Sequence, residues 1–139
     1  MRNIEIGPHQ WHEKFKECLG KEFSDEEYFS VHHLLVLCYM IQCNAYNNKH
    51  KEKVYKILKD FIDGKEPKEI MIENKKLFNG KNKAPILKNE NEKSIFFDKW
   101  EKTIMDIRTD NAKDYCQDIK DWAFEVEKIL NKEYSNKII

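Results

Sequence analysis

Residues 112–130 carry the feature that most constrains the fold of this chain, an apolar stripe with the period of an α-helix. The stripe is formed by Ala112, Tyr115, Cys116, Ile119, Trp122, Ala123, Val126, Ile129 and Leu130. It keeps the 3.6-residue period over about five turns, which makes it the strongest helix signal in the sequence. Asp110 comes just before the stripe and is expected to be the N-cap of this helix.

Two shorter segments, residues 8–23 and 54–62, also place their apolar side chains on one helical face. Pro8 suits the first turn of the earlier helix, because its missing N–H would have no partner there. Gly64 is expected to end the later helix in the left-handed conformation.

The sequence between these helices and the last stripe gives weaker signals. Pro67 is expected to begin a short helix that runs through Phe78 and stops at Gly80. Residues 80–93 are polar and show no period, so they predict a surface loop. Residues 94–108 fit either a helix or a short strand.

Residues 24–46 predict a continuous helix at the centre of the molecule. Ser24 followed by Glu27 has the spacing of a capping box, with Ser24 as N-cap. From Leu34 to Ile41 the apolar side chains cover almost the whole circumference, which is typical of a buried helix.

These patterns predict an all-α fold, a single-domain bundle of four to five helices spanning residues 1–139, with the 24–46 helix buried at its centre. The chain has only 4 glycines and 3 prolines, too few for a sandwich or barrel with many tight turns. The longest apolar run has eight residues, whereas a membrane span needs about 20. We expect no membrane association, no secretory leader and a cytoplasmic location.

Charge and motifs narrow the function classes. Lys and Arg (25) balance Asp and Glu (25), although residues 47–93 are basic, with a net charge of +5 from 13 basic and 8 acidic residues. Nucleic-acid binding through residues 49–93 is the least favoured hypothesis, because mixed surface charges usually serve only solvation. There is no phosphate-binding glycine loop, no G-x-S-x-G and no H-E-x-x-H, so an enzymatic role stays open without a positive motif.

The four cysteines, at positions 18, 38, 43 and 116, form no C-x-x-C pair. This spacing excludes zinc-ribbon and thioredoxin-like sites. His9, His12 and Glu13 lie on one helical face, but no third and fourth ligand is adjacent, so we expect no metal site there.

Tyr28, His32, Tyr39 and Cys43 form a partly polar seam along the 24–46 helix. The backbones of His32 and Cys43 would lie about 16 Å apart, too far for both to bind one metal. We expect His32 to be largely buried and hydrogen-bonded to a tyrosine hydroxyl or to a carboxylate such as Glu22. His33 should be more exposed.

Two interpretations of His32 follow. In the first it borders a pocket that is also lined by Tyr39 or by residues of the last helix near Tyr115 and Cys116. In the second it only joins helices, and no cavity lies beside it.

Residues 7–46 and 103–130 resemble an uncharacterised bacterial family, DUF5946. Its members carry an SPGCW-like turn, an E-Y…V-H-R-L-T-V-D-x-Y-x-x-Q-H-P segment, then L-T-V-x-D-V and H-x-x-x-V-x-x-W-A-x-x-V-W near the C-terminus. The matching residues are Trp11, Glu22, Tyr28, Val31, His32, Leu34, Val36, Tyr39, Gln42, Ile104, Asp106, Ile107, Trp122, Ala123 and Val126. The resemblance implies a helical fold and no established activity.

The chain departs from the family pattern at several polar positions. Gln10 stands where the family has cysteine, Leu37 where it has aspartate, and Cys43 where it has histidine. Tyr115 stands at the position of the C-terminal histidine, and Glu127 at that of the final tryptophan. A histidine-rich site in the family would be reduced here to His32, with Cys43 and Cys116 as softer substitutes.

The sequence therefore predicts a non-catalytic helical module that binds a protein partner or itself. The alternative is a metal- or small-ligand-binding helical protein, enzymatic or not, with a polar seam centred on His32. The candidate ligand-binding residues are His32, Tyr39, Cys43, Tyr115 and Cys116. We expect no cofactor.

Overall fold

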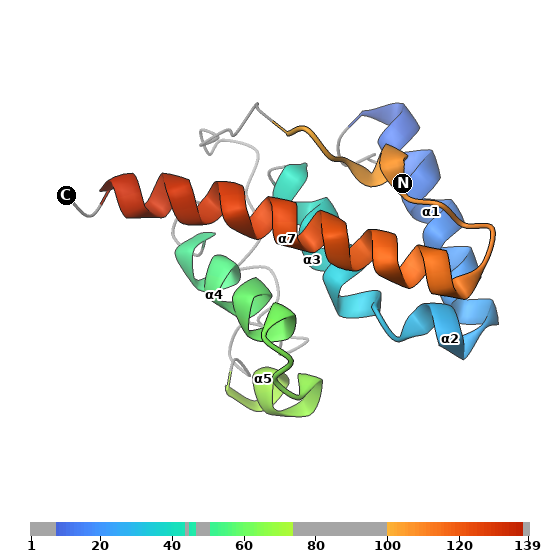
Figure 1. Ribbon diagram of the computed structural model, residues 1–139, viewed down its shortest axis with the longest axis horizontal. Helices are drawn as coiled ribbons and strands as arrows, with labels where there is room; N and C mark the ends of the chain where they lie inside the picture. The colour runs from blue at the N-terminus through green and yellow to red at the C-terminus, as the bar shows by residue number, and fades with distance from the viewer. Residues whose placement is uncertain (1–7, 44, 47–50, 74–99, 138–139) are drawn as a thin grey trace, which may run out of the picture.

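The computed structural model describes residues 8–43, 45–46, 51–73 and 100–137, and every regular element within these ranges is helical (Figure 1). The elements are α1 (His9–Ser24), α2 (Glu26–Phe29), α3 (His32–Gln42), α4 (Lys51–Ile62), α5 (Pro67–Glu73), the 3-10 turn η3 (Ile104–Asp106) and α7 (Ala112–Lys137). The predicted all-α fold class is confirmed. The predictions for residues 74–99, which include the end of the helix at Phe78 and the 80–93 loop, lie outside the described residues.

The long helix α7 crosses the molecule and packs against α2, α3 and α4 (Figure 1). The helix α3 also packs against α4, α1 packs against α2 and η3, and α5 packs against α4. No helix in the described ranges has the length and apolar character needed to cross a membrane.

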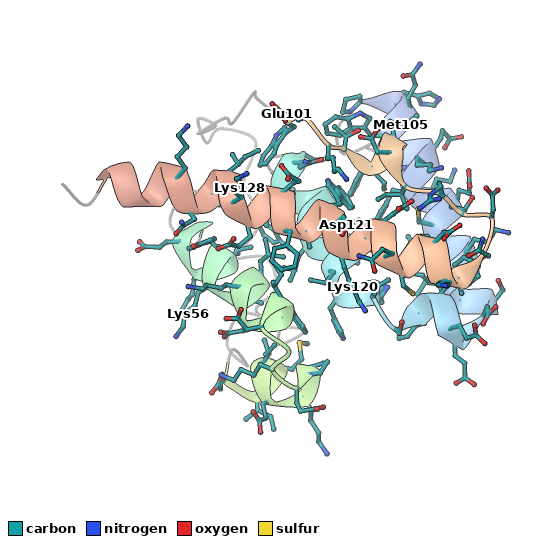
Figure 2. All side chains as sticks on the ribbon, viewed as in Figure 1. Lys56, Glu101, Met105, Lys120, Asp121 and Lys128 are labelled. Atoms are coloured by element: carbon teal, nitrogen blue, oxygen red, sulfur yellow. The ribbon has the colours of Figure 1, made fainter. Side chains whose placement is uncertain are left out.

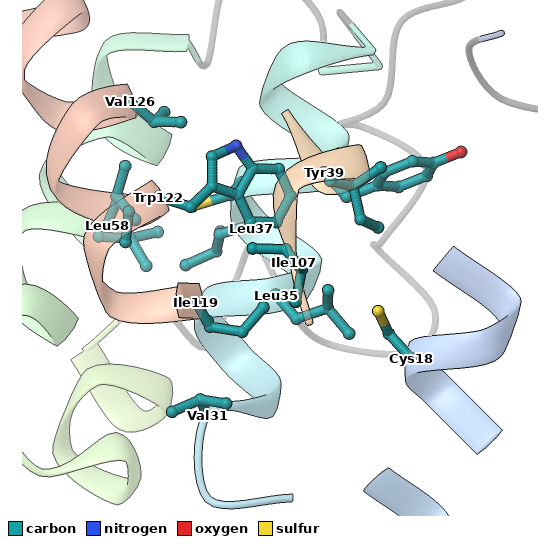
Figure 3. Close-up of a cluster of buried hydrophobic side chains, with 14 of the residues drawn as sticks. Cys18, Val31, Leu35, Leu37, Tyr39, Leu58, Ile107, Ile119, Trp122 and Val126 are labelled. Atoms are coloured by element: carbon teal, nitrogen blue, oxygen red, sulfur yellow. The ribbon is translucent and has the colours of Figure 1, made fainter. Parts of the chain in front are cut away.

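The core combines side chains from α3, α4 and α7 (Figure 3). Leu35 of α3, Leu58 of α4, and Ile119 and Trp122 of α7 are all fully buried. Fully burying one such apolar side chain contributes about 1.5–3 kcal/mol. The apolar stripe predicted for residues 112–130 is therefore the face with which α7 covers the core.

The predicted continuous helix over residues 24–46 is wrong, because the chain leaves the helical conformation at Asp25 and again at Val31, and α3 ends at Gln42. Ser24 is the last residue of α1, and its hydroxyl donates to the carbonyl of Gly20 at 2.9 Å. Asp25 is extended and caps α2 instead, since its carboxylate accepts the Glu27 N–H at 3.0 Å. The second break follows at Val31, the N-cap of α3, just after Ser30 has donated its hydroxyl to the Glu27 carbonyl.

The start of α7 also differs from the prediction by one residue. Asn111, and not Asp110, caps the helix, because the Asn111 side-chain oxygen accepts the Asp114 N–H at 2.8 Å. The prediction for Gly64 is confirmed. Gly64 adopts a φ of 87°, a backbone conformation that residues with a side chain rarely take.

The ambiguous segment before α7 forms neither an α-helix nor a strand over its described part. Thr103 and Asp106 make a reciprocal capping box, which closes the single turn η3. Gln42 of α3 holds the preceding loop in place by donating to the carbonyl of Lys102 at 2.7 Å.

Candidate functional site

A buried carboxylate, that of Glu22, joins three helices. Glu22 lies in the last turns of α1 and is only 1 % exposed. Its carboxylate accepts a hydrogen bond from Nδ1 of His32 in α3 at 2.7 Å, and another from the hydroxyl of Tyr115 in α7 at 2.5 Å. The predicted pairing of His32 with a carboxylate such as Glu22 is confirmed.

Burial governs the acid–base behaviour of this cluster. It raises the pKa of Glu22, and the hydrogen bonds from Tyr115 and His32 oppose that rise. Burial likewise raises the pKa of Tyr115, and it raises the pKa of the neighbouring Cys18 thiol to about 12. A thiol with such a pKa is not a nucleophile at neutral pH.

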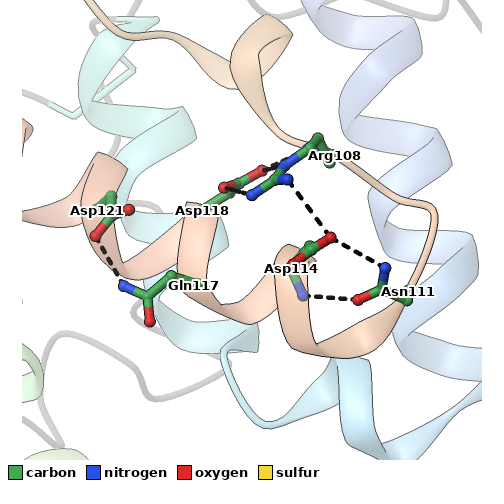
Figure 4. A network of polar contacts seen from close by, with 6 residues as sticks. All are labelled: Arg108, Asn111, Asp114, Gln117, Asp118 and Asp121. Atoms are coloured by element: carbon green, nitrogen blue, oxygen red, sulfur yellow. Dashed lines mark hydrogen bonds and ion pairs between the residues drawn. The ribbon is translucent and has the colours of Figure 1, made fainter.

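The first turns of α7 hold Tyr115 in position. Arg108 forms a two-pronged pair with Asp118, from Nε at 2.9 Å and from the terminal nitrogen at 3.0 Å (Figure 4). This hydrogen-bonded pair lowers the pKa of Asp118. Together with the Asn111 cap, the pair fixes the entry of the chain into α7, one turn before Tyr115 meets Glu22.

On its other side, His32 belongs to a group of five aromatic rings that we call the aromatic strip: Phe23, Phe29, His32, His33 and Phe61. The centroids of Phe23, Phe29 and His32 form a triangle, with Phe23 5.6 Å from each of the other two and Phe29 4.7 Å from His32. His33 lies 5.7 Å from His32, and Phe61 lies 5.0 Å from His33. The Phe29 and His32 rings are stacked with an interplanar angle of 11°, and the His33 and Phe61 rings with an angle of 10°. The strip connects the end of α1 with α2, α3 and the end of α4.

One end of the aromatic strip is open to solvent. Phe23 is 70 % exposed and Phe29 is 38 % exposed, whereas the side chain of His32 is 20 % exposed. His33 and Phe61 are partly buried. Because His32 and His33 share this intermediate burial, the structure does not show the predicted contrast between a buried and an exposed histidine.

The predicted polar seam does not form one line, because the helix breaks between Tyr28 and His32. Tyr28 turns toward α7, where its hydroxyl donates to the carbonyl of Thr109 at 3.0 Å and its ring lies against that of Tyr115. Tyr39 stacks on Phe15 of α1 with centroids 4.1 Å apart.

The other two predicted site residues, Cys43 and Cys116, lie in different parts of the molecule. Cys43 lies at the C-terminal end of α3, about 16 Å along the helix from His32. Burial raises its pKa to about 11. Cys116 of α7 contacts the second helix break, since its thiol donates to the carbonyl of Glu27 at 3.3 Å and lies 3.4 Å from the Ser30 hydroxyl.

His9 is exposed and His12 is partly buried, both at the start of α1. Across the described part of the chain, no group of three or more histidine, cysteine, aspartate or glutamate side chains is placed to hold a metal ion.

Comparison with protein families identifies a match over most of the chain. The model of DUF5946, a family of unknown function, matches residues 9–130. The chain belongs to the DUF5946 family. No curated protein and no solved structure matches it.

The matched range includes every member of the Glu22 cluster, from Cys18 in α1 to Tyr115 in α7. Glu22, Tyr28 and His32 are among the residues on which the sequence resemblance rests, and each of them contacts another member of the cluster or Tyr115. Sequence reasoning missed Phe23 and Phe29, although two phenylalanines within the polar stretch KEFSDEEYFS were a signal for an exposed apolar patch.

Proposed function

We propose that this chain is a non-catalytic protein-interaction module of the bacterial cytoplasm, folded as a single helical domain, which binds a partner protein through the aromatic strip. The observation that carries the proposal is the exposure of Phe23 and Phe29 beside His32, whose ring the buried Glu22 holds in place.

The exposed rings favour an interface. Burying a phenylalanine side chain fully contributes about 1.5–3 kcal/mol, so leaving two neighbouring rings in water forgoes that free energy in the isolated chain. Aromatic side chains are enriched among the residues that dominate binding free energy at interfaces. A partner that covers both rings recovers this free energy.

The fixed geometry of the strip supports the same proposal. His32 is tied to Glu22 at one ring nitrogen and stacked on Phe29 at its face. A preordered surface loses little conformational entropy on binding, which raises affinity for a given contact area.

The chemistry of the buried cluster favours binding over catalysis. Both carboxylate oxygens of Glu22 already accept hydrogen bonds within the chain. Burial raises the pKa values of the Cys18, Cys38 and Cys43 thiols, which keeps these groups protonated and unreactive at neutral pH.

The test is binding by variants of the tagged chain in cells of its own host. A partner captured by the wild type is identified by mass spectrometry, purified, and titrated against the wild type, Phe23→Ala and Phe124→Ala. Phe124 is the matched control, because it is also exposed, at 59 %, but lies on α7 outside the strip. The proposal expects Phe23→Ala to weaken binding about tenfold and Phe124→Ala to leave it unchanged.

Equal affinities of the two variants, or the absence of any reconstituted partner, would contradict the proposal. Sedimentation of the purified chain separates partner binding from self-association. A dimer that Phe23→Ala dissociates would show that the partner is a second copy.

A second candidate function is ligand binding centred on His32 and Tyr115, the two predicted site residues that share Glu22. The observation that favours it is the hydrogen bond at Nδ1, which leaves Nε2 of His32 as the nitrogen available to a ligand or metal. Elemental analysis of the purified protein tests the metal version. Stoichiometric zinc, iron or nickel, lost in His32→Ala, would support this candidate over the interaction module.

A further inference from the structure

We infer that the partner of the aromatic strip presents lysine or arginine side chains around an apolar surface, an inference that rests on the proposed function. The charge beside the exposed rings carries it.

The charge beside the exposed rings is negative. Asp25, Glu26 and Glu27 are all exposed and occupy the cap and first turn of α2, between Phe23 and Phe29 in the sequence. Lys21 is the one lysine or arginine from position 19 to position 33. A partner that buries the rings therefore brings its rim against three carboxylates, and Lys or Arg side chains at that rim gain from the contact.

Two synthetic peptides test the inference directly. One is an amphipathic helix of Leu and Lys, and the other has Glu at every Lys position. We expect the Leu/Lys peptide to bind, measured by fluorescence anisotropy of a labelled peptide, and the Leu/Glu peptide to bind at least about tenfold more weakly. Added salt should weaken the Leu/Lys complex, because it screens the attraction of the acidic rim.

Two pairs of variants locate the binding. Phe23→Ala should weaken the Leu/Lys complex about tenfold while Phe124→Ala leaves it unchanged. Glu26→Lys should weaken it as well, whereas Glu101→Lys, the same charge reversal at an exposed site outside the strip, should not. Figure 2 shows Glu101 at the opposite edge of the view from α2, and Lys120 and Lys128 along the α7 helix that carries the control residue Phe124.

Equal binding of the two peptides, or equal effects within either pair of variants, would overturn the inference. Failure of the Leu/Lys peptide alone does not overturn the proposed function. If the chain rejects this peptide but still binds its purified partner through Phe23, the strip is an interface for a partner of different chemistry. If both fail, the proposed function fails with the inference.

Discussion

Glu22 is the residue on which the arrangement of α1, α3 and α7 depends most directly. A carboxyl group that is 1 % exposed must have its oxygens satisfied, and His32 and Tyr115 satisfy one each. Removing either donor leaves a buried oxygen without its partner. The resulting loss of unfolding free energy is larger than the loss caused by removing an exposed hydrogen bond.

Tyr115→Phe is therefore expected to lower the free energy of unfolding by about 1–3 kcal/mol at neutral pH. The loss should be smaller below the ordinary pKa of the carboxyl group, 4.5, because a protonated Glu22 no longer needs a second donor. Chemical denaturation at both pH values measures the two differences. Tyr55→Phe is the control, since its hydroxyl bonds Asn131 and Glu127 near the surface instead of in the core, and it should cost less than about 0.5 kcal/mol.

His33 gives the chain a second dependence on pH. Burial lowers its pKa from the ordinary value of 6.5, so the folded chain takes up this proton less readily than the unfolded chain does. The contribution of neutral His33 to the stability of the folded state is complete above pH 6.5, and it is lost as the pH falls through the lowered pKa. We expect His33→Gln to flatten the decline of the unfolding free energy on acidification between about pH 7 and pH 5. An unchanged slope would show that another group causes it.

At the scale of the elements, two side-chain caps determine where helices begin. Asp25→Ala and Asn111→Ala are each expected to lower the free energy of unfolding by about 1 kcal/mol, because each removes the acceptor for a first-turn N–H. Ser24→Ala is the matched control and should be nearly neutral. Thermal denaturation distinguishes the two groups, and a larger loss in Ser24→Ala than in Asp25→Ala would restore Ser24 as the cap.

Apart from the 24–46 segment, the helices of the described ranges could be predicted from the sequence, but most of their ends could not. The apolar period of residues 112–130 depends on burial along one face, and that burial is what the structure shows. The choice between Ser24 and Asp25 depends instead on which of two adjacent polar side chains meets a free N–H. Both residues suit an N-cap by type, so only the local geometry separates them.

The break at Val31 had a still weaker signal. The apolar run that follows it suggested one continuous helix, and no glycine or proline marks the end of α2. At the end of α2 the Ser30 hydroxyl bonds the backbone carbonyl of Glu27. Serine makes the same kind of hydrogen bond inside intact helices, so its presence does not mark a helix end.

At the scale of the whole molecule, Trp122 connects α7 to the rest of the core. It is the largest fully buried side chain, and Trp122→Ala is expected to lower the free energy of unfolding by about 3–5 kcal/mol. Its ring nitrogen has no hydrogen-bond partner among the residues that the structure describes, so Trp122→Phe should cost clearly less. Denaturant titration checks both, and a near-neutral Trp122→Ala would contradict the described packing of α7.

The candidate site was partly accessible from the sequence. The pairing of His32 with Glu22 could be anticipated, because a histidine in an apolar helix needs a polar partner and Glu22 precedes it on the neighbouring helix. The aromatic strip could not be anticipated, since it joins α1, α2, α3 and α4 through a turn at Asp25 and a break at Val31 that the sequence does not mark.

The central claim, that the strip is a protein interface, is tested most directly by site-specific photocrosslinking in the native host. A benzoylphenylalanine placed at position 23 should join covalently to one identified partner, and the same group at position 124 should not, although both native side chains are exposed. Equal yields of the same adduct from both positions, or no adduct from position 23, would contradict the claim.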